Sequence, residues 1–198
     1  NKNFKILDPT EAKITLYENL RLPPQSCHDY VGNIGILKDL GMGQETIEQD
    51  LNNSQAEELK LKIESIEIEI NSKKNTRPFK ELKDELNSTK KLFELRKFVN
   101  TWRAYEKIKN LGNYLDYSDL NKYSLALLKK FPEIADLYDY IIVDEFQDTN
   151  KLQIEFLISL ARKKNITVVG DVNQSIYGFR GAYKENLSFF KDALNIKE

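Results

Sequence analysis

The first half of the chain carries apolar residues at the three- and four-residue spacing of amphipathic helices. A first helix is expected over residues 9–20, and Pro23-Pro24 is expected to end it. A short segment around residues 34–40 should stop at Gly41-Met42-Gly43. The apolar positions of the first helix are Ala12, Leu16 and Leu20.

Two longer stripes follow, and they predict a helical hairpin. The first stripe consists of Leu59, Ile63, Ile66 and Ile70. After a break at residues 75–78, the second consists of Phe79, Leu82, Leu86, Phe93 and a continuation over 99–105. Two long amphipathic helices joined by a short turn are expected to pack antiparallel. We expect Trp102 and Tyr105 to be core residues and the outer charges to be a solvated face.

The last part of the chain changes to short apolar runs, which are typical of buried parallel strands. Tyr140-Ile141-Ile142-Val143 predicts a strand buried on both faces, and residues 166–169 predict a second. Between them, Thr149 or Asn150 can cap a helix that reaches Ala161. A connection of this length is what a parallel crossover requires. The pattern therefore predicts a helix-rich α/β chain with a parallel sheet layer.

Polar residues follow both predicted strands, where ligands bind in open α/β sheets. Asp144 and Glu145 suit a Mg²⁺–phosphate site, because one carboxylate can hold the metal and the next can orient or deprotonate a water. The alternative is a pair of solvated strand-end charges. Gly170-Asp171 ends the second strand, and the amide of Gln174 can hydrogen-bond a terminal phosphate from the same crevice.

A group of aromatic and cationic residues comes next. Tyr177, Phe179 and Arg180 are separated by glycines that free the backbone, and such a group can stack on unpaired bases. The alternative is a core aromatic pair beside a surface arginine.

Two segments, 143–150 (Val-Asp-Glu-Phe-Gln-Asp-Thr-Asn) and 169–182 (Val-Gly-Asp followed by Gln-Ser-Ile-Tyr-Gly-Phe-Arg-Gly-Ala), resemble the second and third signature motifs of UvrD/Rep-type superfamily-one DNA helicases. Weaker matches at residues 115–120 and 4–9 resemble the segment before the metal-binding strand and the entrance to the helical insertion. All of these matches occur in the order that the family has.

The resemblance implies a role for each motif residue and a division of the chain. Asp144 would bind Mg²⁺, Glu145 would be the catalytic base, and Gln174 would sense the γ-phosphate of ATP. Residues 1–110 would be the helical insertion subdomain, and 111–198 part of a RecA-like motor domain. Tyr177, Phe179 and Arg180 would contact single-stranded DNA; Asp148 and Asp171 would support the metal site.

The same resemblance implies an ATP- and Mg²⁺-dependent motor. It would translocate 3′ to 5′ on single-stranded DNA and unwind duplex at single-strand/double-strand junctions. The family often has tryptophan at the position of Phe179, so stacking would keep less area here. Five lysines of the hairpin are candidates for contact with duplex DNA: Lys73, Lys74, Lys80, Lys90 and Lys91. The simpler interpretation is that they belong to a mixed, solvated surface.

A phosphate-binding loop is missing from the chain. Such a loop needs glycine followed by lysine, and none of the 8 glycines is followed by lysine. A second motor domain is also lacking. We therefore expect a piece of a longer helicase that hydrolyses no ATP alone and whose own oligomers say little about the parent. A repair helicase and a helicase–nuclease subunit both remain open, as does a preference for DNA over RNA.

Composition sets looser limits on function. The 198 residues carry a formal charge of −1, so any nucleic-acid path must be a local stripe. Cys27 is the only cysteine and His28 the only histidine, which excludes an intrachain disulfide and a Cys/His zinc site. With no membrane-length apolar run, a cytoplasmic protein is expected. The rival from another class is a catalytically dead coiled-coil interaction module, which explains the hairpin but not the motif residues.

Overall fold

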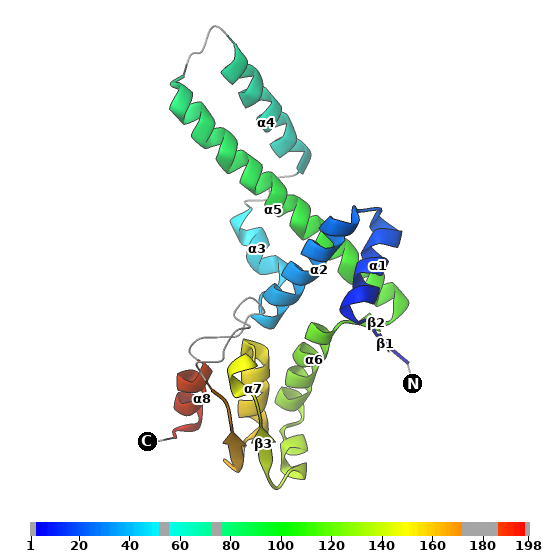
Figure 1. The fold of residues 1–198 in the computed structure, drawn as a ribbon, viewed down its shortest axis with the longest axis vertical. Coiled ribbons are helices and arrows are strands. Elements are labelled where there is room, and N and C mark those ends of the chain that lie inside the picture. The colour runs from blue at the N-terminus through cyan, green and yellow to red at the C-terminus, as the bar shows by residue number, and fades with distance from the viewer. Residues whose placement is uncertain (1–2, 52–55, 73–76, 172–185, 197–198) are drawn as a thin grey trace. The chain divides into compact units, whose positions relative to one another are not determined.

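The computed structural model describes residues 3–51, 56–72, 77–171 and 186–196. The chain divides into two compact units, Asn1–Met42 with Lys109–Glu198, and Gly43–Ile108. It is helix-rich, and the strands of the described residues form two small parallel sheets of two strands each (Figure 1). Among the described helices, none has both the length and the apolar composition that crossing a membrane demands.

The first unit begins with a short strand and a well-capped helix. Strand β1 (Lys5–Ile6) pairs in parallel with β2 (Tyr114–Leu115). Helix α1 (Pro9–Leu20) follows, with Asp8 and Glu11 forming a reciprocal capping box. Its bounds confirm the helix expected over residues 9–20.

Helix α2 (Pro24–Asp39) is longer than the short segment expected at 34–40. The two prolines do not serve as a simple break. Helix α1 ends when Arg21 adopts a left-handed conformation, Pro23 then precedes the next helix, and Pro24 occupies its first turn, where a missing N–H costs nothing.

Helices and strands alternate along the rest of the first unit. Helix α6 (Tyr117–Lys130) and the 3-10 helix η1 (Pro132–Leu137) lead into β3 (Ile141–Val143). After the 3-10 helix η2 (Phe146–Asp148), α7 (Lys151–Leu160) returns the chain to β4 (Ile166–Val168), and α8 (Asn186–Leu194) is the last element. Strands β3 and β4 pair in parallel, as the sequence predicted (Figure 1).

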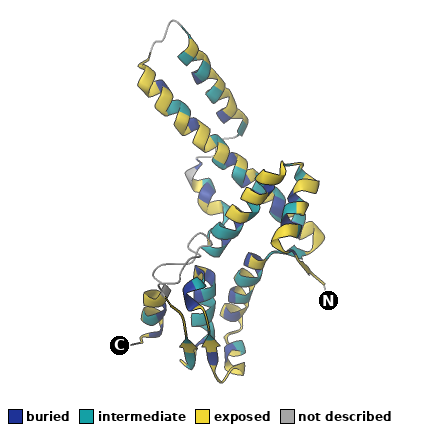
Figure 2. Ribbon diagram, in the orientation of Figure 1, coloured by how far each residue is buried: buried dark blue, intermediate teal, exposed yellow. Residues whose placement is uncertain are grey.

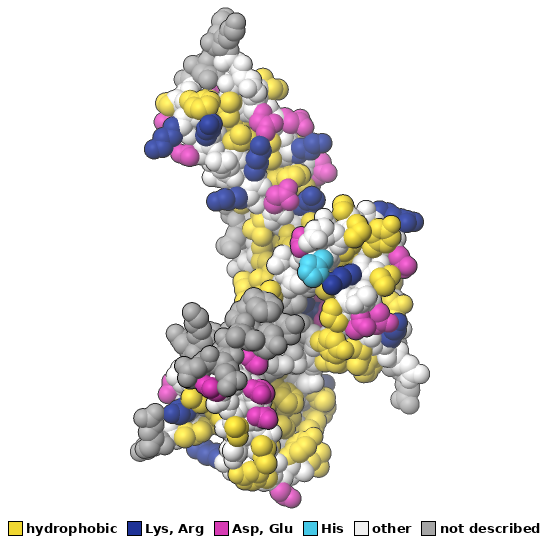
Figure 3. Space-filling view, in the orientation of Figure 1, with side chains coloured by type: hydrophobic (Ala, Val, Ile, Leu, Met, Phe, Trp, Pro, Cys, Tyr) yellow, Lys and Arg dark blue, Asp and Glu magenta, His cyan; other side chains and the backbone are white. Residues whose placement is uncertain are grey.

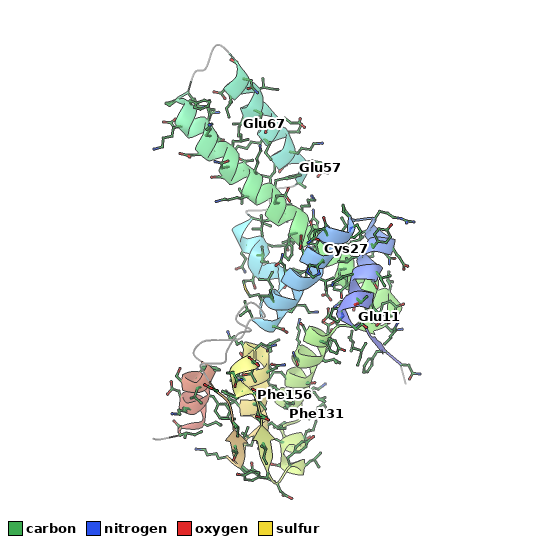
Figure 4. All side chains as sticks on the ribbon, viewed as in Figure 1. Glu11, Cys27, Glu57, Glu67, Phe131 and Phe156 are labelled. Atoms are coloured by element: carbon green, nitrogen blue, oxygen red, sulfur yellow. The ribbon has the colours of Figure 1, made fainter. Side chains whose placement is uncertain are left out.

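One face of the β3–β4 sheet holds a cluster of buried hydrophobic side chains. Phe146, Ile154 and Phe190 are buried there with Ala161 and Leu194. The rings of Phe146 and Phe190 pack edge to face, with their centroids 5.1 Å apart. Helices α7 and α8 thus cover the same face. Figure 4 marks Phe156 on α7 and Phe131 just after α6.

The other face of this sheet differs from the expectation of a strand buried on both sides. Ile142 is 72% exposed and Tyr140 is 61% exposed. The side chains on this face include Thr167, whose hydroxyl lies 2.7 Å from that of Tyr140. The prediction fails because the described residues supply a helical layer against one face of the sheet only.

The second unit contains α3 (Gln44–Asp50), α4 (Ala56–Asn71) and all but the last turn of α5 (Phe79–Gly112). Leu59 and Ile66 of α4 are buried, as are Leu82 and Val99 of α5, so these members of the predicted stripes lie inward (Figure 2). Phe79, which was assigned to the second stripe, is instead 52% exposed. Figure 1 shows α4 and α5 running in opposite directions. Trp102 and Tyr105 are buried, which confirms their assignment to a core; they are 2% and 1% exposed.

Ion pairs connect the outer faces of α4 and α5. Lys90 bonds Glu67, which Figure 4 labels on α4, at 2.7 Å. Arg77 bonds Glu69 at 2.7 Å and Glu85 at 2.6 Å. These charges of the hairpin therefore form the mixed, solvent-facing surface that the sequence indicated.

Candidate functional site

The parallel register of β3 and β4 brings their carboxyl ends to one edge. Val143 pairs with Val168, and the N–H of Val169 donates to the Val143 carbonyl at 2.8 Å. One step further, the Phe146 N–H donates back to the Val169 carbonyl at 2.9 Å. The segments that begin at Asp144 and at Gly170 consequently leave the sheet side by side.

The chain turns sharply at the two adjacent carboxylates. Glu145 has a left-handed backbone with φ 51° and ψ 40°, and its N–H donates to Asp144 Oδ1 at 2.9 Å. This conformation costs a residue with a side chain on the order of 1–2 kcal/mol, and strain of that kind gathers at functional sites. Both carboxylates are exposed, so both are open to a ligand.

The side-chain amide of Gln147 links the two strand ends. Its Nε2 donates to Glu145 Oε2 at 2.6 Å, and its Oε1 accepts the backbone N–H of Asp171 at 3.0 Å. Gln147 is buried, although it belongs to a polar segment. The amide therefore connects the candidate base on one strand with the segment that leaves the other.

A side chain at position 170 would displace this amide from its place beside the glycine. A Cβ built there would lie 2.4 Å from Gln147 Oε1 and 3.1 Å from the Phe146 nitrogen. From sequence, Gly170 was expected only to end the second strand.

The turn after Gln147 ends in a helix cap. Thr149 Oγ1 donates to the Phe146 carbonyl at 2.6 Å, and Asn150 forms a reciprocal capping box with Gln153 at the start of α7. Asp148 Oδ1 is buried and has no hydrogen-bond partner among the described residues. A buried carboxylate oxygen without a partner is costly unless a ligand satisfies it.

Within the described part of the chain, the carboxylates of this turn are also without cationic partners. Among the described residues, no lysine or arginine forms a salt bridge with Asp144, Glu145 or Asp148, and Figure 3 shows acidic side chains on the surface over α7. Uncompensated carboxylate oxygens are the donors that a hard cation such as Mg²⁺ prefers. The residues present therefore fit a magnesium-assisted phosphate site.

Several residues singled out from sequence lie outside the described part of the chain. They are Gln174, Tyr177, Phe179 and Arg180. Asp171, which lies just before them, is exposed, and its backbone is held by Gln147. The structure thus brings together the Asp144–Glu145 turn and the start of the second motif.

A buried four-charge network went unnoticed in the sequence. Lys38 Nζ bonds Asp116 at 2.8 Å and also Asp119, while Lys109 Nζ bonds Asp116 at 2.7 Å and Asp119 at 2.6 Å. Burial alone raises the pKa of Asp116, but the charges of Lys38 and Lys109 outweigh it and bring that pKa down to about 2. The two aspartates also form the capping box of α6.

Asp39, next in sequence to Lys38, reaches toward the capped end of α7. Burial raises its pKa, the nearby side chains of Ser118, Asn121 and Asn150 oppose that rise, and the charge of Asp116 adds to it. A folded-state pKa above the unfolded value means that ionised Asp39 destabilises the fold at neutral pH. The sequence gives no sign that Asp39 lies near the cap of α7, because its proximity to Asn150 appears only in the folded chain.

Comparison with known proteins matches residues 1–195 to the model of the family "UvrD/REP helicase N-terminal domain". The ATP-dependent DNA helicase PcrA of Staphylococcus aureus (strain Mu50) is 31% identical over 199 residues, which cover 96% of this chain and 22% of that protein. The protein of the same name from Staphylococcus epidermidis (strain ATCC 12228) is 38% identical over 105 residues, covering 50% of this chain and 14% of the relative. The chain spans about a fifth of the length of the first of these relatives.

Proposed function

The chain belongs to the UvrD/REP helicase N-terminal domain family, and we propose that it forms part of an ATP-dependent DNA helicase. In this proposal the complete protein couples ATP hydrolysis to 3′–5′ translocation on single-stranded DNA and unwinds duplex at single-strand/double-strand junctions. The observation that carries the proposal is the turn at Asp144 and Glu145, whose carboxylates lack cationic partners among the described residues and leave the sheet beside Gly170.

Each motif residue receives one role. Asp144 holds Mg²⁺, which would neutralise charge on the ATP phosphates, and Asp148 and Asp171 support that metal site. Glu145 accepts the proton of the attacking water, and Gln174 hydrogen-bonds the terminal phosphate. Tyr177, Phe179 and Arg180 stack on and pair with the single strand.

The proposed division by function assigns residues 1–110 to the helical insertion and 111–198 to part of the motor domain. The compact units divide the chain differently, because residues 1–42 pack with 109–198. In our proposal α1 and α2 therefore belong structurally with the motor segment, while α3, α4 and most of α5 form the body of the insertion.

The catalytic assignment is tested by DNA-stimulated ATP hydrolysis in the complete coding sequence. Glu145→Gln keeps the size of the side chain and removes its basicity, so we expect kcat to fall by about 10²–10⁴-fold. Glu133→Gln on η1 is the matched control and should leave kcat unchanged. Full activity of Glu145→Gln would refute the assignment.

The 198-residue chain by itself is proposed to hydrolyse no ATP, because it contains no Gly-x-x-x-x-Gly-Lys segment to hold the phosphates. DNA-stimulated hydrolysis by the isolated chain that disappears with Glu145→Gln would contradict this.

The DNA contacts are tested by fluorescence anisotropy with labelled single-stranded DNA. Tyr177→Ala and Arg180→Ala are expected to weaken binding, by roughly 1–3 kcal/mol for the stacked ring. Tyr123→Ala and Arg162→Ala, on α6 and just after α7, are the matched controls. Unchanged affinity in Tyr177→Ala and Arg180→Ala would favour an interaction module without DNA contact.

A further inference from the structure

The geometry points to Gln147 as a positioning residue that ties the carboxylate of Glu145 to the end of β4, an inference that rests on the proposed function of Glu145. Its buried amide donates to Glu145 Oε2 at 2.6 Å and accepts the Asp171 N–H at 3.0 Å. These two bonds join the turn that carries the base to the segment that runs toward Gln174.

The direction of the two bonds fixes the orientation of the amide. A backbone N–H can only donate, so the atom that faces Asp171 must be the oxygen. The NH₂ group must then face Glu145, where it bonds the ionised carboxylate. A glutamine meets both requirements with one planar group, whereas a glutamate or a leucine at position 147 fails at least one of them.

Gly170 makes the arrangement specific. Because a Cβ at this position would lie 2.4 Å from Gln147 Oε1, the amide occupies the space that any side chain at 170 would need. A movement of the β4 end is therefore transmitted to the amide and from there to Glu145. In this role Gln147 sets where the Glu145 carboxylate points.

Two substitutions at position 147 distinguish the bond to Glu145 from the bond to the Asp171 N–H. Gln147→Leu removes both bonds. Gln147→Glu keeps an acceptor for the Asp171 N–H but loses the donor and places a second negative charge against Glu145. Gly170→Ala attacks the same bridge from the opposite strand.

Amide hydrogen exchange of the isolated chain reports the bond to Asp171. We expect Gln147→Leu and Gly170→Ala to speed exchange of the Asp171 amide by about tenfold, the value of one ordinary hydrogen bond. Gln147→Glu should stay within about twofold of the unsubstituted chain. Gln25→Leu is the control. Gln25 Nε2 donates to Asp29 Oδ1 at 3.1 Å on the exposed surface of α2, so its loss should leave exchange of the Asp171 amide unchanged.

ATP hydrolysis by the complete protein reports the bond to Glu145. In both Gln147→Leu and Gln147→Glu, kcat should fall by about 10–100-fold, the range for residues that orient a catalytic group, with little change in the KM for ATP. A lower kcat in Gln147→Glu, with the Asp171 amide still protected from exchange, is the result that a merely structural role of Gln147 would not give.

Two results would overturn the inference: a kcat in Gln147→Glu within about twofold of the unsubstituted protein, or an Asp171 amide in Gln147→Leu that exchanges no faster. The failure of the proposed function is distinguishable, since it appears as full activity in Glu145→Gln while the exchange response of Asp171 to Gln147→Leu persists.

Discussion

On the hairpin of α4 and α5, the carboxylates of Glu67, Glu69 and Glu85 each bond a lysine or an arginine, whereas Asp144 and Glu145 at the end of β3 bond none among the described residues. The same side-chain types thus serve two purposes. Paired, exposed charges keep a helical surface soluble and contribute little free energy. Carboxylates without cations at a strand end retain their negative potential for a ligand.

A third arrangement of charges separates the effect of pairing from that of burial. It consists of Lys38, Lys109, Asp116 and Asp119. These charges are paired like those of the hairpin, but Lys38, Lys109 and Asp119 are buried and Asp116 is partly buried; Lys109 is 1% exposed. Removing one member of such a network leaves an uncompensated buried charge. Pairing should therefore matter far more here than on the hairpin.

The largest effect is expected for Asp119→Ala. The substitution leaves two buried lysines with one aspartate and removes half of the α6 capping box, so the free energy of unfolding should fall by about 3–5 kcal/mol. Urea denaturation followed by circular dichroism measures it, with Glu67→Ala on the hairpin as the exposed counterpart. Equal effects of the two substitutions would erase the distinction between the regions.

A smaller effect is expected from pH. Because the pKa of Asp116 is lowered to about 2 in the folded chain, its stabilisation is present above the unfolded pKa of about 4 and is lost as the pH falls toward 2. The contribution lost is on the order of 2 kcal/mol.

Unfolding free energies measured from pH 5 down to pH 2 should therefore decline less steeply in Asp116→Asn than in the unsubstituted chain. Parallel declines would show that the two lysines do not hold Asp116 ionised in the fold.

The smallest effect is expected for Arg77→Ala on the hairpin. Arg77 bonds two glutamates, yet all three side chains face solvent, where water and salt screen the attraction. The midpoint of thermal unfolding should move by no more than about 2 °C, and by less in 0.5 M salt. A shift as large as that of Asp119→Ala would mean that hairpin charges are not a solvated surface.

Spacing in the sequence was sufficient for the most regular elements, whereas α2 proved longer than expected and α3, α6 and α8 were not predicted. The apolar stripe at Ala12 and Leu16 correctly predicted α1. The two apolar runs correctly predicted a parallel pair of strands, which are followed by Asp144 and Gly170. Local patterns suffice there because helices and strands repeat with fixed periods.

Contacts between residues distant in sequence could not be obtained in this way. Lys38 lies 78 residues from Asp116, and the Gln147 amide meets the Asp171 N–H across 24 residues. Nothing in the spacing marks these residues as partners. The exposed face of β3 was missed for a related reason. An apolar run indicates that a strand can be covered on both faces, but it does not show whether the described residues supply both covering layers.

The central claim, that the strand-end carboxylates form a cation site while the hairpin carboxylates do not, is tested most directly by titrating Mn²⁺ into the ¹⁵N-labelled chain. Paramagnetic broadening should appear first at the amides of residues 144–148 and be weakened by Asp144→Asn, while the amides around Glu67 and Glu69 stay sharp. Broadening that begins on the hairpin, or that is indifferent to Asp144→Asn, would contradict the account.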